Sequence, residues 1–284
     1  MRLPDWIRVS NRADIHETKN LLRRHGLSTV CEEARCPNRN ECFSKPTATF
    51  MILGASCTRN CGFCSVNPSA PESVNEDEPE NVARAAREMG LKYVVVTSVT
   101  RDDLPDGGAG QFARTIASIR GRLPSAKIEV LTPDFKGDLD ALKTVLSARP
   151  DVFNHNVETV DRLYAVVRPD ADYRRSLYVL QTAAAMASDV LIKSGFMLGL
   201  GETAEEVTAL LRDLRLAGCD FVTVGQYLRP SRNNLPVVEY IAPAAFEKLR
   251  QTALDMGFKY AACGPLVRSS MNAEEMYKNV NREQ

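Results

Sequence analysis

The sequence predicts an α/β protein in which parallel strands alternate with helices to form a partial (β/α)6 barrel of parallel strands. From residue 47 onward, short runs of apolar and β-branched residues alternate with segments of helical periodicity. This alternation occurs six times, whereas a complete eightfold barrel needs two more strand–helix units. A doubly wound parallel sheet is the alternative architecture that fits the same pattern.

Each element follows from its local periodicity. A first helix is expected over residues 14–27, with Gly26 as its stop signal. The expected strands cover residues 47–53, 92–98, 127–132, 151–156, 190–198 and 221–226. The helices expected between and after these strands cover residues 79–89, 109–121, 137–147, 172–187, 203–217 and 243–256.

The regions outside the alternation are interpreted as extensions of the barrel. Residues 31–46 are polar and irregular, which predicts a loop held by whatever its cysteines bind. The polar tail over residues 277–284 is expected to fray. We therefore expect an N-terminal extension over residues 1–46, a barrel over residues 47–257 and a C-terminal extension over residues 258–284.

Charge and hydropathy exclude several classes of protein. The 284-residue chain carries 36 Lys+Arg and 36 Asp+Glu, so bulk electrostatic binding to nucleic acid or to a membrane is not expected. No apolar run reaches the length of a membrane span, and the N-terminus lacks the apolar core of a secretory signal. A transit-like segment is not evident either, so we expect a cytoplasmic protein.

The cysteines are concentrated in one part of the chain. Six of the eight lie within residues 31–64, while Cys219 and Cys263 stand apart and are interpreted as small buried residues. In a cytosolic chain of this length, such crowding indicates metal or redox chemistry rather than disulfides.

The first group, Cys57, Cys61 and Cys64, follows the first expected strand with the spacing C-x3-C-x2-C. In parallel α/β folds, functional groups gather beyond the C-terminal ends of the strands. Three thiolates on a four-iron cluster leave one iron free for an exchangeable ligand. A zinc knuckle and buried free thiols are the alternatives, but the strand-to-turn context and the scarcity of histidine favour an iron–sulfur cluster.

The second group, Cys31, Cys36 and Cys42, has the spacing C-x4-C-x5-C. Structural zinc and a second iron–sulfur cluster both remain open as explanations. In each case one ligand is missing, and no nearby cysteine supplies it.

The stretch TATFMILGASCTRNCGFCSV resembles the radical S-adenosylmethionine superfamily. The resemblance implies that the amino and carboxylate groups of S-adenosylmethionine bind the open iron. Cleavage of the sulfonium by an electron from the cluster would then give a 5′-deoxyadenosyl radical. Such a radical abstracts hydrogen from an unactivated carbon, which acid–base catalysis cannot do.

Further stretches narrow the resemblance to the lipoyl synthase family over about residues 28–275. They are CEEARCPNRNECF, TSVTRDDLPDGGAGQFA, NHNVETV, SGFMLGLGET, GQYLRPSRNNLPV and CGPLVRSS. The resemblance implies a sulfurtransferase that inserts two sulfur atoms at C6 and C8 of an octanoyl chain on a carrier lysine. It also implies two four-iron clusters, one on Cys57, Cys61 and Cys64 that cleaves S-adenosylmethionine and an auxiliary one that donates sulfur.

The resemblance assigns the auxiliary cluster to Cys31, Cys36 and Cys42, with a serine of the terminal RSS motif as its fourth ligand. Ser269 and Ser270 are the candidates, and we favour Ser270. A serine oxygen matches iron less well than a thiolate does, which suits a cluster that must open to release sulfur. The family usually has tyrosine after this motif, whereas this chain has Met271.

The resemblance also implies which loops hold S-adenosylmethionine. Asn154, Asn156 and Glu158 follow the fourth expected strand, where Glu158 could accept from the ribose hydroxyls. Ser98 is expected near the methionine carboxylate. Gly199 and Gly201 are expected to flank the ligand with their backbone. Ordinary strand ends and turns remain the alternative for all of these positions.

Several loop residues have plainer interpretations. Asp102, Asp103 and Asp106 are expected to form turns, and Arg101 to pair with one of these aspartates. The loop containing Tyr227, Arg229 and Arg232 is expected to be rigid and polar and could meet a protein partner.

The resemblance implies several partners. They are octanoylated lipoyl carrier domains (the E2 subunits of 2-oxoacid dehydrogenases and the H protein of glycine cleavage), an electron donor such as flavodoxin or ferredoxin, and an iron–sulfur cluster carrier. A biotin synthase is the nearest rival enzyme, but the second trio and the RSS motif argue against it. A two-cluster electron carrier is the rival from another class, and it would not explain the open coordination positions.

Overall fold

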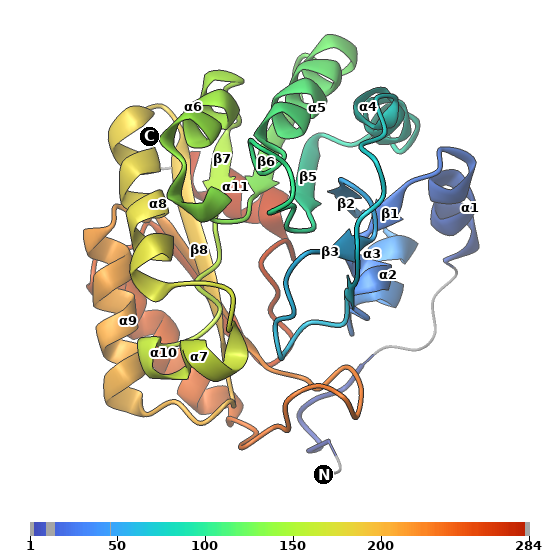
Figure 1. The fold of residues 1–284 in the computed structure, drawn as a ribbon. Helices are drawn as coiled ribbons and strands as arrows, with labels where there is room; N and C mark the ends of the chain where they lie inside the picture. Colours follow the sequence, from blue (N-terminus) through green and yellow to red (C-terminus); the bar gives the residue numbers. More distant parts are fainter. Residues whose placement is uncertain (1–2, 10–14, 46, 282–284) are drawn as a thin grey trace. The chain divides into compact units, whose positions relative to one another are not determined.

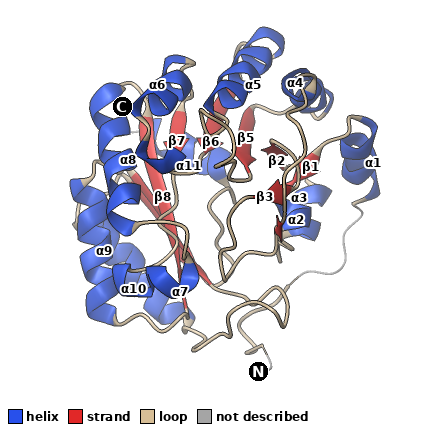
Figure 2. Cartoon of the chain, in the orientation of Figure 1, coloured by secondary structure: helices blue, strands red, loops and turns tan. Residues whose placement is uncertain are grey.

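The computed structural model describes residues 3–9, 15–45 and 47–281, and the chain forms two compact units. The N-terminal unit comprises Val9–Arg59 and Ser65–Phe153. The C-terminal unit comprises Met1–Arg8, Asn60–Cys64 and Asn154–Gln284. Figure 1 gives the element labels used below, and Figure 2 shows helices and strands alternating along the chain.

The N-terminal unit contains three of the predicted parallel strands. β2 (Thr49–Ile52) pairs with β5 (Tyr93–Ser98), and β5 pairs with β6 (Lys127–Leu131), both in parallel. Almost every side chain of β2 and β5 is buried, as expected for strands covered on both faces. β7 (Val152–Asn154) lies where the chain passes into the C-terminal unit.

Three helices of the N-terminal unit follow these strands. They are α4 (Glu78–Glu88), α5 (Ala109–Arg122) and α6 (Leu139–Ser147). α6 begins where the Asp138 side chain accepts hydrogen bonds from the amides of Asp140 and Ala141, which satisfies two otherwise unpaired donors of the first turn.

The C-terminal unit repeats the same pattern. β8 (Leu191–Leu198) pairs in parallel with β9 (Phe221–Gln226), which pairs in parallel with β10 (Tyr260–Gly264). The helices of this unit are α7 (Tyr164–Val167), α8 (Tyr173–Met186), α9 (Ala204–Leu216), α10 (Pro243–Asp255) and α11 (Ala273–Asn281). α9 begins with a capping box formed by Thr203 and Glu206.

Two expectations for the N-terminal region are wrong in detail. Residues 31–46 are not simply a loop, because α2 (Val30–Glu33) and α3 (Arg39–Ser44) occupy most of that stretch. Such short helices depend on tertiary contacts, such as the 2.7 Å hydrogen bond from Thr18 Oγ1 to the carbonyl of buried Phe43. β1 (Ser28–Thr29) also pairs antiparallel with β2, so this region adds a strand to the sheet.

The helix expected over residues 14–27 is present as α1 (His16–Arg24), and position 14 lies outside the described residues.

The C-terminal region differs from expectation in two places. β10 was not predicted from the sequence, since Ala261, Ala262 and Gly264 are small and have weak strand propensity. The expected fraying of residues 277–284 is wrong for the described part, because α11 continues to Asn281 and buries Met276 and Val280. Its amphipathic face is covered, which outweighs the polar composition of the tail.

None of the helices within residues 3–9, 15–45 and 47–281 is both long enough and apolar enough to span a bilayer.

Candidate functional site

The first cysteine trio follows β2, as predicted. Leu53 and Gly54 turn the chain with positive φ values of 69° and 89°, and Cys57 lies in the two-residue strand β3 (Ser56–Cys57). Cys57, Cys61 and Cys64 are all half-buried. Cys57 belongs to the N-terminal unit, whereas Cys61 and Cys64 belong to the C-terminal unit.

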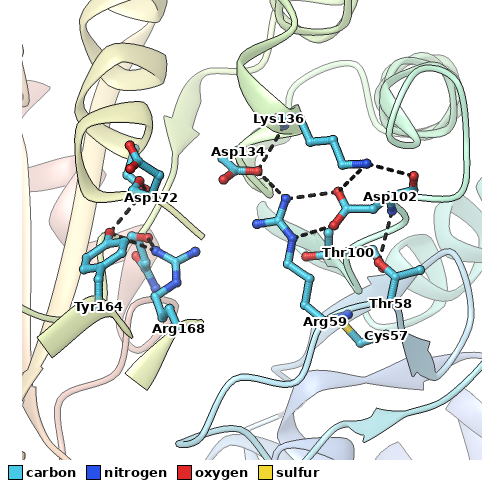
Figure 3. Close-up of polar contacts among 12 residues, drawn as sticks. Cys57, Thr58, Arg59, Thr100, Asp102, Asp134, Lys136, Tyr164, Arg168 and Asp172 are labelled. Atoms are coloured by element: carbon cyan, nitrogen blue, oxygen red, sulfur yellow. Dashed lines mark hydrogen bonds and ion pairs between the residues drawn. The ribbon is translucent and has the colours of Figure 1, made fainter. Parts of the chain in front are cut away.

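A buried ion-pair network anchors the Cys57 side of the motif (Figure 3). Arg59 Nε and Nη2 donate to the two carboxylate oxygens of Asp102 at 2.7 and 3.0 Å, and Nη2 also donates to Asp134 Oδ1 at 2.6 Å. Burial alone would lower the pKa of Arg59, but the hydrogen bonds to Asp102 and Asp134 outweigh it and raise that pKa. Arg59 is therefore a permanent cation held between the loops that follow β5 and β6.

The backbone beside Arg59 is fixed as well. The Thr58 amide and hydroxyl both donate to the carbonyl of Thr100, at 3.1 and 3.0 Å, and the Asp102 amide donates to Thr58 Oγ1 at 3.1 Å. The Arg59 amide then donates to Cys57 Sγ at 3.4 Å. This first cysteine consequently has a fixed donor directed at its sulfur.

The Cys61–Cys64 side is anchored by other residues of the C-terminal unit. The Gly62 amide donates to the Val167 carbonyl at 2.9 Å, and the Gly62 carbonyl accepts from the Leu235 amide at 3.0 Å. Asn234 Nδ2 donates to the Cys64 carbonyl at 2.7 Å. Residues 234 and 235 of the loop over residues 225–237, which was predicted to be able to meet a partner, thus hold this turn.

All three cysteines of the second trio belong to the N-terminal unit. Cys31 and Cys36 are joined by a backbone hydrogen bond of 3.1 Å, and Cys42 lies in α3. Burial, together with repulsion from the other thiols of the trio, raises the pKa of Cys31 to about 12, and hydrogen bonds from Thr49 partly oppose this. Burial and repulsion from Cys36 likewise raise the pKa of Cys42 to about 11.

In the part of the chain that the structure describes, no group of three or more His, Cys, Asp or Glu side chains is arranged to hold a metal ion. Of the two remaining cysteines, Cys219 is fully buried as expected. Cys263 is only half-buried, because β10 exposes more of its surface than β9 does.

The residues predicted to hold S-adenosylmethionine after β7 lie together in the C-terminal unit, next to the terminal motif. Asn154 Nδ2 donates to Ser269 Oγ at 2.7 Å, and Ser269 Oγ donates to Asn156 Oδ1 at 3.2 Å. Glu158 has a positive φ of 66°, and its backbone forms an isolated parallel β-bridge with Phe196 of β8. Desolvation raises the pKa of Glu158, while Arg168, Asn156 and Arg268 oppose the shift.

The Arg168 side chain binds the backbone of the loop after β7. Its Nη1 donates to the carbonyls of Asn156 and Val157 at 3.0 and 3.3 Å, and to Tyr164 Oη at 3.2 Å. Tyr164 Oη in turn donates to the Val157 carbonyl at 2.8 Å. Figure 3 shows the Arg168 guanidinium beside the Tyr164 hydroxyl. A buried guanidinium therefore fixes the backbone that presents Asn156 and Glu158.

The glycine turn after β8 is internally satisfied. The Gly199 carbonyl accepts from the Val238 amide at 2.9 Å, and the Glu202 carboxylate accepts from the amides of Gly199 and Leu200. The Gly201 carbonyl accepts from Arg162 Nη2 at 2.8 Å. Contact between Gly199 and a ligand would therefore be van der Waals in character.

The loop after β5 contains one predicted ligand contact and the three aspartates. Ser98 Oγ is buried and makes no hydrogen bond with any residue that the structure describes. Arg101 pairs with Asp103 at 2.8 Å, as predicted. Asp106 caps the amides of Gly108 and Gly110, which confirms its interpretation as a turn former.

Three supporting residues, Arg59, Asn234 and Arg168, were not predicted. Arg59 lies inside the cysteine motif, so its position was a signal for a supporting role. Asn234 and Arg168 had no such signal, because their contacts join residues 170 and 12 positions apart along the chain.

The side chains present fit an iron–sulfur and S-adenosylmethionine site. The Ser98 hydroxyl is buried and makes no hydrogen bond with any residue that the structure describes, and a bound ligand would supply a partner for it. Cys31, Cys36 and Cys42 provide three sulfur donors within the N-terminal unit, and thiols lose their protons when they bind a metal.

Comparison with known proteins places this chain in a family. The profile of the radical SAM superfamily matches residues 51–214. A lipoyl synthase from Caldicellulosiruptor bescii is 53% identical over 287 residues, covering 99% of each chain. A lipoyl synthase from Caldicellulosiruptor saccharolyticus is 55% identical over 277 residues, covering 97% of each chain.

The solved structure of methylornithine synthase (PylB) superimposes with a TM-score of 0.50 at 15% identity, covering 96% of this chain and 92% of that one. This likeness concerns the fold alone, and it agrees with the predicted partial barrel. The full-length identity to the two curated relatives is far more specific. The chain therefore belongs to the lipoyl synthase family of the radical SAM superfamily.

Proposed function

We propose that this chain inserts two sulfur atoms at C6 and C8 of an octanoyl chain carried on the lysine of a lipoyl carrier domain. As a member of its family, the chain uses S-adenosylmethionine and iron–sulfur chemistry. The observation that carries the proposal is the identity of 53% and 55% to lipoyl synthases along nearly the whole chain. A zinc knuckle at Cys57, Cys61 and Cys64 would not account for this identity.

Two clusters are part of the proposal. Cys57, Cys61 and Cys64 would hold the cluster that binds S-adenosylmethionine, leaving one iron open. Cys31, Cys36 and Cys42 would hold the auxiliary cluster. When bound, these groups supply the electron, the 5′-deoxyadenosyl radical and the sulfur.

Ser270 is proposed as the fourth ligand of the auxiliary cluster. Its neighbour Ser269 already uses its hydroxyl to join Asn154 and Asn156, so the two serines are suited to different tasks. Ser269 would orient the two amides that face the adenosyl ligand. Ser270 would offer an oxygen ligand that dissociates more readily than a thiolate.

Six residues are proposed to contact S-adenosylmethionine. Glu158 would accept from the ribose hydroxyls, and Ser98 would donate to the methionine carboxylate. Asn154 and Asn156 would hydrogen-bond the ligand from the end of β7, and Gly199 and Gly201 would allow close backbone approach. Arg168 would keep Asn156 and Glu158 in place, because its guanidinium binds the intervening backbone.

The proposed partners follow from the reaction. They are octanoylated carrier domains such as the E2 subunits of 2-oxoacid dehydrogenases and the glycine cleavage H protein, an electron donor such as flavodoxin or ferredoxin, and a cluster carrier that rebuilds the auxiliary site. We place the reaction in the cytoplasm. We also retain residues 47–257 as the functional barrel, with extensions over residues 1–46 and 258–284.

The test is to label the sulfide of the reconstituted clusters with a heavy isotope and to supply ordinary sulfide in solution. In the first turnover, both sulfur atoms of the lipoyl product should carry the label. Product with unlabelled sulfur would show that the clusters are not the donors. S-adenosylmethionine cleavage without any sulfur insertion into the octanoyl carrier would contradict the proposal itself.

A further inference from the structure

Arg59 differs from the other residues between the motif cysteines because its charged side chain is buried. Only 4% of that side chain is exposed. Burying a guanidinium is costly unless its donors are paired, and here they meet two carboxylates. The fork binds Asp102 through two donors, and this geometry is specific to arginine.

Both carboxylates are attached to rigid parts of the N-terminal unit. Asp102 follows β5, and its amide donates to Thr58 Oγ1. Asp134 follows β6 and is fully buried. Asp134 also accepts from the Lys136 amide at 3.1 Å, which fixes the orientation of its carboxylate. The two strand ends therefore define where Arg59 can lie.

The position of Arg59 determines the position of its own amide. That amide donates to Cys57 Sγ at 3.4 Å. Hydrogen bonds to cluster sulfur atoms withdraw charge from them and so stabilise the more negative, reduced state of a cluster. A side chain directed away from the cysteines thus controls a donor directed at one of them.

We infer that Arg59 is a positioning residue that sets the reduction potential of the cluster bound by Cys57. The inference rests on the proposed function, in which Cys57 is a ligand of the radical-generating cluster. Asp102 and Asp134 act through Arg59, and Thr58 acts on the same backbone through its hydrogen bonds to Thr100 and Asp102.

The test uses the full chain with Cys31, Cys36 and Cys42 replaced by Ala, so that only one cluster contributes to the signal. Arg59→Lys keeps the charge but cannot bridge two carboxylates with a planar fork. Thr58→Val removes the second anchor without changing charge. Arg101→Lys is the matched control, because Arg101 is also buried but pairs with Asp103 and donates to the Leu53 carbonyl rather than to Asp102 or Asp134.

After anaerobic reconstitution, the reduction potential, the electron paramagnetic resonance spectrum of the reduced cluster and the thermal midpoint are measured. Arg59→Lys and Thr58→Val should shift the potential to more negative values and change the spectrum. Arg101→Lys should lower only the thermal midpoint. Failure of Arg59→Lys to fold would leave Thr58→Val to decide.

An unchanged potential and spectrum in folded, iron-loaded Arg59→Lys and Thr58→Val proteins would overturn the inference while leaving the proposed function intact. A parent protein that binds no cluster on Cys57, Cys61 and Cys64 would instead overturn the ligand assignment on which the inference depends.

Discussion

Ser98 is a buried hydroxyl at the end of β5 that finds no hydrogen-bond partner in the described part of the chain. An unsatisfied buried polar group costs stability unless a ligand supplies the missing bond. Ser194 offers a comparison, because its hydroxyl is equally buried but donates to the His155 carbonyl at 2.8 Å. The two serines therefore separate a hydroxyl that is proposed to bind a ligand from one that is bonded within the fold.

Ser98→Ala should weaken S-adenosylmethionine binding about fivefold, which corresponds to about 1 kcal/mol, with no loss of thermal stability. Ser194→Ala should destabilise the protein by about 1 kcal/mol and leave the affinity for the ligand nearly unchanged. Equilibrium binding to the reconstituted protein and thermal unfolding measure the two effects. Equal affinities for the Ser98→Ala and parent proteins would remove Ser98 from the binding site.

The two serines of the terminal motif are also separable by substitution. Ser270→Ala should reduce lipoyl formation at least about tenfold while S-adenosylmethionine cleavage continues, because only the auxiliary ligand is lost. Ser269→Ala should weaken S-adenosylmethionine binding, since Asn154 and Asn156 lose the hydroxyl that joins them. Lipoyl product and 5′-deoxyadenosine are quantified in the same reaction. If Ser269→Ala stops sulfur insertion and Ser270→Ala does not, the ligand assignment is reversed.

Among the elements, the loop over residues 229–237 is bound to the turn that contains Cys61 and Cys64. Asn234 donates to the Cys64 carbonyl, and the Leu235 side chain lies within 3 Å of the position that a Cβ on Gly62 would take. Any larger residue at Gly62 would push this loop away. The loop and the cysteine turn therefore form one packed element of the C-terminal unit.

Asn234→Ala should accelerate release of iron from the Cys57, Cys61 and Cys64 site to a chelator by about fivefold, because the hydrogen bond that fixes the Cys64 backbone is lost. The neighbouring exposed residue gives the control, and Asn233→Ala should release iron at the parental rate. The experiment uses the variant that lacks the auxiliary cysteines. Identical release rates for the two variants would show that the loop does not secure the turn.

β9 also holds the terminal motif in place. A Cβ added to Gly225 would lie 2.3 Å from the carbonyl oxygen of Val267, which precedes the RSS motif by one residue. Because the obstacle is the backbone of Val267 and not a flexible side chain, the segment around Val267 must move when Gly225 is replaced by a larger residue. The absence of a side chain at Gly225 thus allows Ser269 and Ser270 to approach the strand ends of their unit.

Gly225→Ala should lower stability by about 1–3 kcal/mol and reduce lipoyl formation, because the terminal segment is displaced. Gly121→Ala is the matched control, since Gly121 lies in α5 with open space around it. This change should raise the stability of the protein by about 0.5–1 kcal/mol. Denaturant unfolding and a single-turnover assay measure the two effects. A stable, fully active Gly225→Ala protein would contradict the close approach seen at Val267.

For the molecule as a whole, the two cysteine trios have different settings. Cys57, Cys61 and Cys64 are half-buried. Cys57 is held by contacts within the N-terminal unit, and the turn with Cys61 and Cys64 is held by contacts within the C-terminal unit. The Cys31 trio lies entirely within the N-terminal unit, and Cys31 is only 5% exposed. The two sites should therefore lose their metal independently.

Replacing Cys31, Cys36 and Cys42 with Ala should leave roughly half of the iron and preserve part of the S-adenosylmethionine cleavage, with no lipoyl product. The parent chain, without a partner that rebuilds the auxiliary cluster, should make at most about one lipoyl group per chain, because the proposed auxiliary cluster is a single sulfur store. Iron analysis and product counts against protein concentration test both statements. Several turnovers without a repair partner would show that another sulfur source is used.

Much of the fold was predictable because local periodicity determines it. The six predicted strands are present with ends shifted by a few residues, and the predicted helices α4 to α6 and α8 to α10 lie close to their expected ranges. β10 was not predicted, because Ala261, Ala262 and Gly264 carry little strand propensity and are held by pairing with β9. Local preference was thus a good guide wherever an element buries its own apolar face.

The sequence by itself determined the candidate cysteine ligands, the family resemblance and the order of strands along the chain, because these depend on residue identity and spacing. Only the tertiary structure decided which side chains support those ligands. Arg59 meets Asp102 and Asp134, Asn234 meets Cys64, and Ser269 meets Asn154 through contacts between residues 43 to 170 positions apart. Such contacts form only when the ends of distant strands come together in the folded chain, so the local sequence around each residue does not predict them.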